Sequence, residues 1–362
     1  MSDSTRTSAL ASRHRALGSD LEDWNGMGTA WSYNSDPCDE HDAVRESAGM
    51  FDMSPLKKVY LRGPDAAQVA QHVISRDMNR VYVGKSAYGA ILTEQGTVCD
   101  DAILANNGNN EWLLCHGSGE SMQRLQESAA GLNVDLEFDD NLHNLSVQGP
   151  KTCELLNAHT SCDLGTMAYF HHAATDLFGH ACRISRTGYS GERGYEILAD
   201  GAVIGDIWDN LVGLGVMPCS FTSLDKVRVE AALLFFGYDM TAEHTPWEVG
   251  LGFTMSRKSD YRGKAAAFAA KGNERHLGAG IVINHSDMVA GGETLRRNGQ
   301  DVGIVNSPAY SHRLQQSLAL VHLHPSAAAP GTQLEVVGDG VSYSAEVNPI
   351  PFYDPQKLRV RS

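Results

Sequence analysis

The sequence lacks several features that would assign the chain to a special class of protein. No apolar run among its 362 residues reaches the roughly 20 needed to cross a bilayer, so no membrane span is predicted. The first twenty residues are polar, which argues against a secretory signal and predicts a frayed end. The seven cysteines are scattered and never spaced as CxxC, a pattern typical of reduced thiols. We therefore expect a cytoplasmic protein.

Positive charge is scarce as well. The chain has 29 lysines and arginines against 44 acidic residues, a formal net charge of −15. A surface of this charge repels a phosphate backbone, so nucleic acid is not an expected partner. An anionic ligand would need a local cluster of positive side chains.

Two common catalytic motifs are also missing. The fifteen histidines include no HExxH, and no two histidines with a carboxylate show a metal-binding local spacing, so no metal site is indicated. The stretch Gly188–Gly191 (GYSG) is one residue short of the GxSxG nucleophile elbow.

The patterning indicates two related lobes followed by a β-rich domain. A segment with the alternating pattern of a strand precedes Gly63-Pro64, and a segment with the pattern of a helix follows it. The same order recurs at Gly149-Pro150, 86 residues later. This repeat predicts two similar α+β lobes. From His276 onward, short alternating segments separated by Gly, Pro and Ser turns predict a β-barrel or a sandwich.

Adjacent aspartates form the first candidate for chemistry. Asp100 and Asp101 follow the Gly96 turn and enter an apolar strand, which places their side chains on opposite faces. An inward carboxylate is costly unless it is paired, and burial raises its pKa toward a range useful for proton transfer. The alternative is that both residues cap a turn.

Two further segments combine charge with unusual surroundings. Tyr189, Glu192 and Glu196 lie in a glycine-rich stretch that could approach a flat ligand with ring N–H donors, or could simply be a hairpin turn. Arg228 and Glu230 lie among apolar residues in a helix expected from about residue 222 to 234. Such an arginine binds an anionic ligand or forms a structural salt bridge.

Seven segments, in order, resemble the T protein (aminomethyltransferase) of the glycine cleavage system and its tetrahydrofolate-dependent demethylase relatives. They are Asp39–Ser54 (DEHDAVRESAGMFDMS), Leu61–Ala66 (LRGPDA), Gly96–Ile103 (GTVCDDAI), Val147–Pro150 (VQGP), Thr187–Ile197 (TGYSGERGYEI), Asp225–Met240 (DKVRVEAALLFFGYDM) and Tyr261–Ala265 (YRGKA).

The resemblance implies an α+β fold shaped as a three-lobed cloverleaf around a folate site. It implies a discontinuous folate-binding α+β lobe formed by residues 1–52 and 150–255. A second α+β lobe would span residues 53–149, and a C-terminal β-barrel residues 256–362.

The resemblance also implies a cofactor, tetrahydrofolate, and roles for particular residues. Asp101 matches the aspartate beside the reactive folate nitrogens and would be catalytic as well as cofactor-binding. Glu196 matches the glutamate that binds the pterin ring. Tyr189 matches a residue that lines the pocket, and Arg228 matches an arginine of the folate site. Tyr88 and Tyr169 match positions of aromatic rings near the cofactor.

Departures from the glycine-cleavage pattern concern the carbon donor. Residues 51–56 read FDMSPL instead of FDVSHM, while residues 239–252 (DMTAEHTPWEVGLG) and 74–80 (ISRDMNR) are closer to the folate-dependent demethylases, including dimethylsulfoniopropionate demethylase. These changes favour a small O-, N- or S-methyl donor, whose methyl group moves to N5 of tetrahydrofolate. The candidate donor-side residues are Trp31, Tyr33, His116, Trp247 and Glu248.

Two other functions stay open from the sequence. One is an aminomethyltransferase that uses a lipoylated carrier protein, and the other is a non-catalytic folate-binding accessory protein. For each donor-side residue, packing in the core or in a loop is the alternative role.

Overall fold

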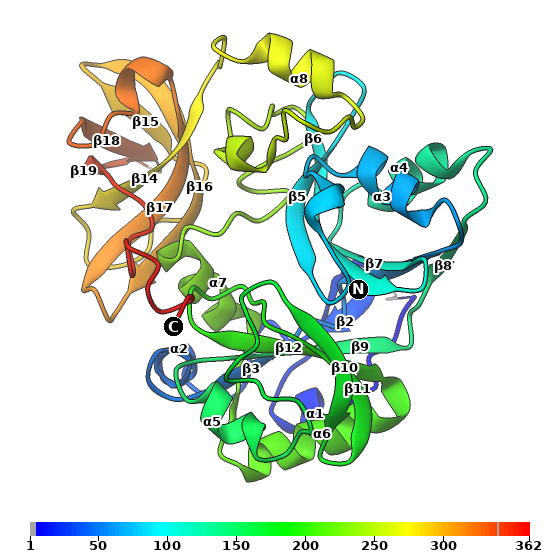
Figure 1. Cartoon of the computed structure of the whole chain (residues 1–362). Helices are drawn as coiled ribbons and strands as arrows, with labels where there is room; N and C mark the ends of the chain where they lie inside the picture. The colour runs from blue at the N-terminus through cyan, green and yellow to red at the C-terminus, as the bar shows by residue number, and fades with distance from the viewer. Residues whose placement is uncertain (1–4, 339) are drawn as a thin grey trace.

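Three lobes surround a common centre in the computed structural model, which describes residues 5–338 and 340–362 (Figure 1). Two lobes contain an open sheet with helices, and the third is a closed barrel. Each lobe has its own apolar core. The predicted α+β cloverleaf with a C-terminal barrel is therefore confirmed. Within the described part of the chain, no helix is both long and apolar enough to span a bilayer.

The first lobe contains a six-stranded sheet. Its spatial order is β10 (His172–Leu177), β11 (His180–Ser185), β12 (Gly194–Asp200), β9 (Leu142–Gln148), β3 (Gly49–Asp52) and β13 (Met217–Pro218). Its helices are α1 (Ala11–Ala16), α2 (Pro37–Glu46), α5 (Thr152–Asn157), α6 (Gly201–Gly213) and α7 (Phe221–Glu230), and a small hairpin pairs β1 (Glu22–Trp24) with β2 (Met27–Thr29). Strand β9 pairs with β3 and β12, so the chain crosses from the second lobe into this sheet at residue 142.

The second lobe contains a five-stranded sheet covered by helices on one face. The strands are β5 (Ser86–Leu92), β6 (Val98–Gly108), β7 (Glu111–His116), β4 (Lys57–Arg62) and β8 (Asp135–Phe138), in that spatial order. The helices are α3 (Ala66–Val73), α4 (Ser121–Ala129) and the short η1 (Met78–Arg80).

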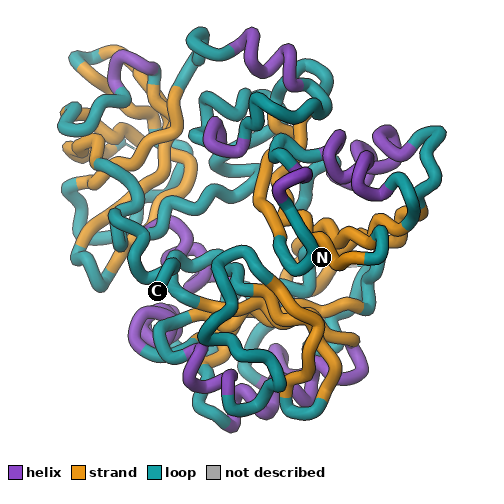
Figure 2. The backbone as a smooth tube through the Cα atoms, viewed as in Figure 1, coloured by secondary structure: helices purple, strands orange, loops and turns teal. Residues whose placement is uncertain are grey.

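The third lobe is a six-stranded closed barrel. Its strands, in order around the barrel, are β14 (Leu277–Ile283), β17 (Gln316–Leu323), β16 (Gln300–Ser311), β15 (Thr294–Arg297), β18 (Gln333–Gly338) and β19 (Val341–Asn348), with η3 (Pro325–Ala327) after β17. The connection from the first lobe, residues 231–276, is mostly loop with η2 (Leu251–Thr254) and α8 (Lys264–Ala270) (Figure 2).

The predicted repeat is present in the backbone. Strand β4 leads through Gly63-Pro64 to α3, and β9 leads through Gly149-Pro150 to α5. The two glycines adopt nearly the same unusual φ angles, +136° and +135°. A Cβ atom on Gly149 would lie 2.5 Å from the Ser47 carbonyl oxygen. Both copies thus need glycine for the same reason, a backbone conformation and a close approach that other residues do not tolerate.

We expect Gly149→Ala to lower the free energy of unfolding by about 1–3 kcal/mol through backbone strain and this overlap. Gly213→Ala is the matched control, because a Cβ there meets nothing within 4 Å. Urea denaturation of both variants measures the difference. Equal stability of the two variants would contradict the strain.

The structure corrects two of the predicted segments. Helix α7 ends at Glu230 instead of residue 234, because Ala232 adopts φ +54° and the Leu233 amide donates to the Arg228 carbonyl. The polar N-terminal segment contains α1 where we expect a frayed end. Leu10 is buried, and His14 Nε2 lies 2.9 Å from an Asp52 carboxylate oxygen, which anchors the segment. Residues 1–4 lie outside the described part.

Candidate functional site

A cavity of about 1210 Å³ lies where the lobes meet. It is larger than the roughly 300–1,000 Å³ typical of small-molecule sites. Its wall includes strands of both open sheets, the loop around η2, the barrel strand β17 and residues 350–361 after the barrel. No single lobe encloses it, so its shape depends on how the lobes pack together.

The adjacent aspartates of β6 point to opposite faces of the sheet, as predicted. Asp100 is buried and accepts hydrogen bonds from the Ser121 hydroxyl and from His116 Nδ1, at 2.8 Å for the latter. Asp101 faces the cavity instead. Neither residue caps a turn, because both lie within the strand. The sheet therefore holds one carboxylate in the interior and presents the other to a ligand.

Asp101 is the carboxyl group of the cavity whose proton affinity is most altered. Burial, followed by the negative charge of Asp100, raises the pKa of Asp101 to about 7, although an interaction with the Tyr88 hydroxyl opposes this rise. A group with this pKa exchanges protons readily near neutral pH. The position thus suits general acid–base chemistry.

Three tyrosines form part of the same wall. Tyr88, on β5, lies diagonally across from Asp101 on the same face, since Ala90 pairs directly with Asp101. The Tyr189 hydroxyl donates to the Leu234 carbonyl at 2.5 Å, which joins the glycine-rich loop to the segment after α7. Tyr169 is more than one-third exposed. Burial raises the pKa of all three hydroxyls, so they stay neutral and can donate hydrogen bonds.

Glu196 presents a second carboxylate from β12 in the first lobe. Asn144 Nδ2 donates to its Oε1 at 3.1 Å, and the Thr187 hydroxyl donates to its Oε2. These contacts fix the carboxylate plane without neutralising its charge, because no lysine or arginine is among its partners in the described residues. A fixed carboxylate is a good acceptor for the N–H groups of a flat heterocycle.

The cavity wall is rich in positive charge, unlike the whole chain. Four acidic residues line it (Asp77, Asp101, Glu196 and Asp239). Eight basic residues line it: Arg76, Arg80, Lys85, Arg183, Arg257, Lys258, Lys357 and Arg361. This is the local cluster that an anionic ligand requires on an acidic protein.

Of the sequence-predicted residues, the structure brings six together at this cavity: Tyr88, Asp101, His116, Tyr169, Tyr189 and Glu196. Arg228 lies behind the wall. Its guanidinium contacts Asp225 at 2.6 Å, Asp239 at 2.5 Å and the Ser307 hydroxyl at 2.9 Å. It holds Asp239 in place, which agrees with the structural salt bridge that the sequence left open.

Four donor-side candidates lie away from the cavity wall in the described part of the chain. Trp31 packs on Phe221, and the Tyr33 hydroxyl contacts His14 Nδ1 at 2.8 Å. Trp247 Nε1 donates to the Ala267 carbonyl at 2.6 Å, and Glu248 pairs with Arg275 at 2.8 Å. Packing or loop contacts account for all four.

Several cavity residues have no sequence signal of their own. Asn144 and Thr187 matter through their contacts with Glu196, and Phe253 is 68% exposed beside Tyr88, with ring centroids 6.4 Å apart. Thr187 lies within a family-like segment, which could have indicated it. The basic residues come from four separate parts of the chain, so only the fold gathers them.

Comparison with known proteins gives the family. Residues 10–259 match the GCVT N-terminal domain, and residues 278–354 match the glycine cleavage T-protein C-terminal barrel domain. The chain is 43% identical to a heme-dependent oxidative N-demethylase gamma subunit from Ectopseudomonas mendocina, over 99% of each chain.

Further relatives differ in the reactions that their names describe. The chain is 30% identical to an aminomethyltransferase from Saccharopolyspora erythraea, over 97% of this chain and 98% of that protein. It is 31% identical to a trimethylamine-oxide aldolase from Ruegeria pomeroyi, over 90% of this chain and 44% of that protein. The crystal structure of glycine cleavage system aminomethyltransferase T from Bartonella henselae has the same fold, with a TM-score of 0.90 at 22% identity over 97% of this chain and 98% of that one. The chain thus belongs to the glycine cleavage T-protein family.

Proposed function

We propose that the chain is a tetrahydrofolate-dependent one-carbon transferase whose carbon comes from a small methylated donor. The observation that carries this proposal is the position of Asp101, which faces the shared cavity with a pKa raised to about 7. A bond to a folate nitrogen releases that nitrogen's proton, and a carboxylate titrating near neutral pH is suited to accept it.

The cavity residues fit the chemical groups of tetrahydrofolate. The Glu196 carboxylate, held by Asn144 and Thr187, is an acceptor for pterin N–H groups. Tyr88 and Tyr189 supply flat surfaces, and the basic residues suit the anionic glutamate tail. Together they would hold the reactive nitrogens next to Asp101, so that alignment contributes to the rate.

In the first form of the reaction the methyl group itself moves. The bond from the methyl carbon to the donor heteroatom breaks, a bond to N5 forms, the N5 proton goes to Asp101, and the leaving heteroatom keeps the electron pair. Among O-, N- and S-methyl donors, the names of two relatives, an N-demethylase subunit and a trimethylamine-oxide aldolase, support an N-methyl compound.

The name of the N-demethylase gamma subunit also supports a second form, because it describes that protein's demethylation as oxidative. In that form a heme-dependent partner subunit removes two electrons from the N-methyl group, and water hydrolyses the resulting iminium ion to formaldehyde and the demethylated amine. Formaldehyde and tetrahydrofolate then give 5,10-methylene-tetrahydrofolate and water, without further oxidation. A lipoylated carrier remains the alternative source of carbon, in keeping with the aminomethyltransferase relatives.

One incubation distinguishes these reactions. The full chain is mixed anaerobically with tetrahydrofolate and ¹³C-methyl O-, N- and S-donors in one arm and ¹³C-formaldehyde in another, and the folate product is identified by mass. Labelled methyl-folate supports direct transfer, and enzyme-accelerated methylene-folate from formaldehyde supports the oxidative route. Folate binding without any accelerated product in either arm would overturn both of these forms and leave the lipoylated carrier or a non-catalytic accessory protein.

We expect Glu196→Gln to weaken tetrahydrofolate binding about 10- to 100-fold, because a hydrogen bond to a charged group contributes about 1.5–3 kcal/mol. Isothermal titration calorimetry measures the affinity. Glu335→Gln is the control, since Glu335 is exposed on the barrel strand β18. Equal affinities of the two variants would remove Glu196 from the folate site.

A further inference from the structure

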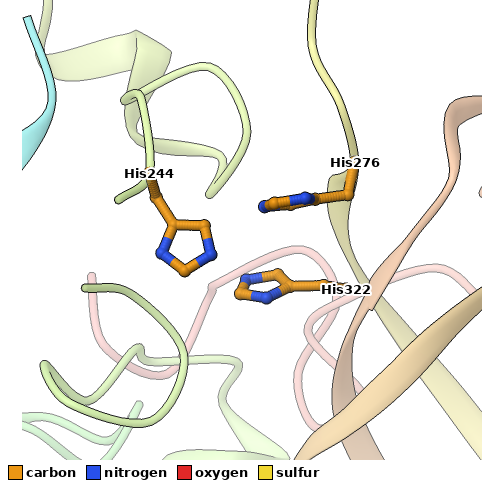
Figure 3. Close-up of side chains that lie close together, drawn as sticks. All are labelled: His244, His276 and His322. Carbon is orange, nitrogen blue, oxygen red and sulfur yellow. The ribbon is translucent and has the colours of Figure 1, made fainter. Parts of the chain in front are cut away.

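Three histidines that the proposed reaction does not use lie together beside the barrel. His244, His276 and His322, the histidine cluster, come from the loop before η2, the residue before β14 and the barrel strand β17 (Figure 3). Their ring centroids are separated by 4.5, 4.7 and 4.9 Å. The rings converge from three elements far apart in sequence, which explains why no local spacing indicated a site.

The arrangement of the three rings fits the binding of one metal ion better than aromatic stacking alone. One ring nitrogen from each residue lies within 4.8 Å of the others, and the ring planes cross at 75°, 45° and 30°. A metal bound at 2.0–2.1 Å by three imidazoles brings these nitrogens to roughly 3.3 Å apart. Metal binding would therefore require the three rings to rotate so that these nitrogens come closer together.

The ring nitrogens also have suitable partners. His276 Nε2 is buried and has no hydrogen-bond partner, so this nitrogen is free to bind a metal ion. His322 Nε2 lies 2.9 Å from the Asp239 carbonyl and donates to it, which leaves Nδ1 as a lone-pair donor, the outer contact typical of a metal-bound histidine.

His244 completes the set through Nε2. Its Nδ1 lies 2.9 Å from the Thr241 amide and 3.0 Å from the Thr241 hydroxyl. The Thr241 amide donates to Nδ1, so Nε2 carries the proton in this arrangement. Metal binding at Nε2 would move the proton to Nδ1, which would then donate to the Thr241 hydroxyl oxygen and lose the contact with the amide.

The second histidine grouping, His41, Asp42 and His312, is different. His41 Nε2 bonds to Glu230 and His312 Nε2 to Asp42, both within 3.0 Å. Arg313 lies 3.6 Å from Asp42. His312 Nδ1 has no hydrogen-bond partner, but His41 Nε2, His312 Nε2 and the Asp42 carboxylate are already occupied, so that grouping does not present three free ligands.

We propose that His244, His276 and His322 bind a divalent transition-metal ion, with Zn²⁺ as the biological occupant. Neutral imidazoles suit Zn²⁺, Ni²⁺, Co²⁺ and Cu²⁺ and disfavour Mg²⁺ and Ca²⁺. The ion would join the loop before η2 to the barrel strand β17 and to the residue that precedes β14. Because His322 also lines the cavity, the ion would stiffen the cavity wall, and a three-histidine set leaves a coordination position for water or another ligand.

Metal binding by the full chain without a histidine tag tests the proposal directly. We expect about one equivalent of zinc by elemental analysis after loading with Zn²⁺ and desalting. We also expect titration with Co²⁺ to give the visible absorption of a nitrogen-ligated site and to raise Tm. Neither stoichiometric zinc nor a Co²⁺ spectrum from the folded wild-type chain would overturn the proposal, whatever the variants do.

His276→Asn assigns the ion to the cluster, because His276 lies at its half-buried edge and the variant is expected to fold. We expect at least about tenfold weaker Zn²⁺ binding. His285→Asn is the control, since His285 stacks on Tyr343 elsewhere on the barrel, and its Zn²⁺ affinity should be unchanged. Equal affinity of both variants would place the ion elsewhere and contradict the assignment.

Discussion

Asp101→Asn is expected to reduce turnover about 10²- to 10⁴-fold, the contribution typical of a positioned acid or base. Asparagine keeps the size of the side chain but cannot accept the proton that a folate nitrogen loses. Binding of tetrahydrofolate should persist, because Glu196 and the tyrosines are untouched. Single-turnover kinetics and calorimetry on the same variant separate the two effects.

The role of Asp101 as a base also predicts the direction in which kcat/KM changes with pH. As a base, Asp101 must be ionised, so kcat/KM of the wild type should rise with pH through a midpoint near the pKa of about 7. Asp101→Asn should lose this step. Asp77→Asn is the control, since Asp77 lines the same cavity from η1. Wild-type turnover in Asp101→Asn would exclude Asp101 as the base.

The raised pKa also affects stability. Because the folded-state pKa lies above the ordinary carboxyl value of 3.8, the favourable contribution of protonated Asp101 is present at low pH and is lost as pH rises through about 7. Asparagine removes this dependence. At pH 8 the variant should therefore unfold at a higher temperature than the wild type in calorimetry, and the difference should disappear below about pH 4.

Arg45→Met is expected to cause the largest loss of stability, about 3–5 kcal/mol, because it leaves the buried Glu230 carboxylate without its arginine, whereas Glu192 keeps Arg359. Arg45 lies in α2 and is fully buried. Its guanidinium contacts Glu230 at 2.7 Å, Glu192 at 3.2 Å and the Ser190 carbonyl at 2.7 Å. The side chain thus joins α2, α7 and the glycine-rich loop.

Calorimetry should show Tm lower by roughly ten degrees for Arg45→Met. Arg15→Met is the matched control, since Arg15 is exposed on α1. The difference between the variants should shrink in acid. Although burial opposes it, the His41 hydrogen bond and the Arg45 charge lower the pKa of Glu230 to about 2, so this stabilisation is lost between pH 4.5 and 2. Similar melting of the two variants at pH 7 would contradict the role of Arg45.

Local chemistry made part of this structure predictable. Strand alternation alone separates Asp100 from Asp101, and a Gly-Pro pair after a strand fixes a backbone turn that recurs in both lobes. Alternating segments with regular turns predict a β-barrel or a sandwich, and the structure contains the barrel. The division at residues 149 and 150 remains a prediction, although β9, which precedes it, pairs with strands of the first sheet.

The rest depends on contacts between distant segments. Nothing near Arg228 in the sequence shows that Asp239 and Ser307 occupy its guanidinium, and nothing near Trp31 shows that Phe221 covers it. The basic lining and the histidine cluster arise in the same way, from residues brought together by three separately folded sheets. Periodicity reports which face of an element is apolar but not which neighbour that face meets.

The return of the chain after the barrel has a consequence for the order of synthesis. Residues 350–361 complete the cavity wall, and Arg359 pairs with Glu192 of the first lobe at 2.8 Å. A growing chain emerging from the ribosome can therefore form both open sheets and most of the barrel while the cavity is still open along one side. The complete binding surface thus forms only after residues 350–361 have docked, so a ligand that contacts them is enclosed after the earlier steps of folding.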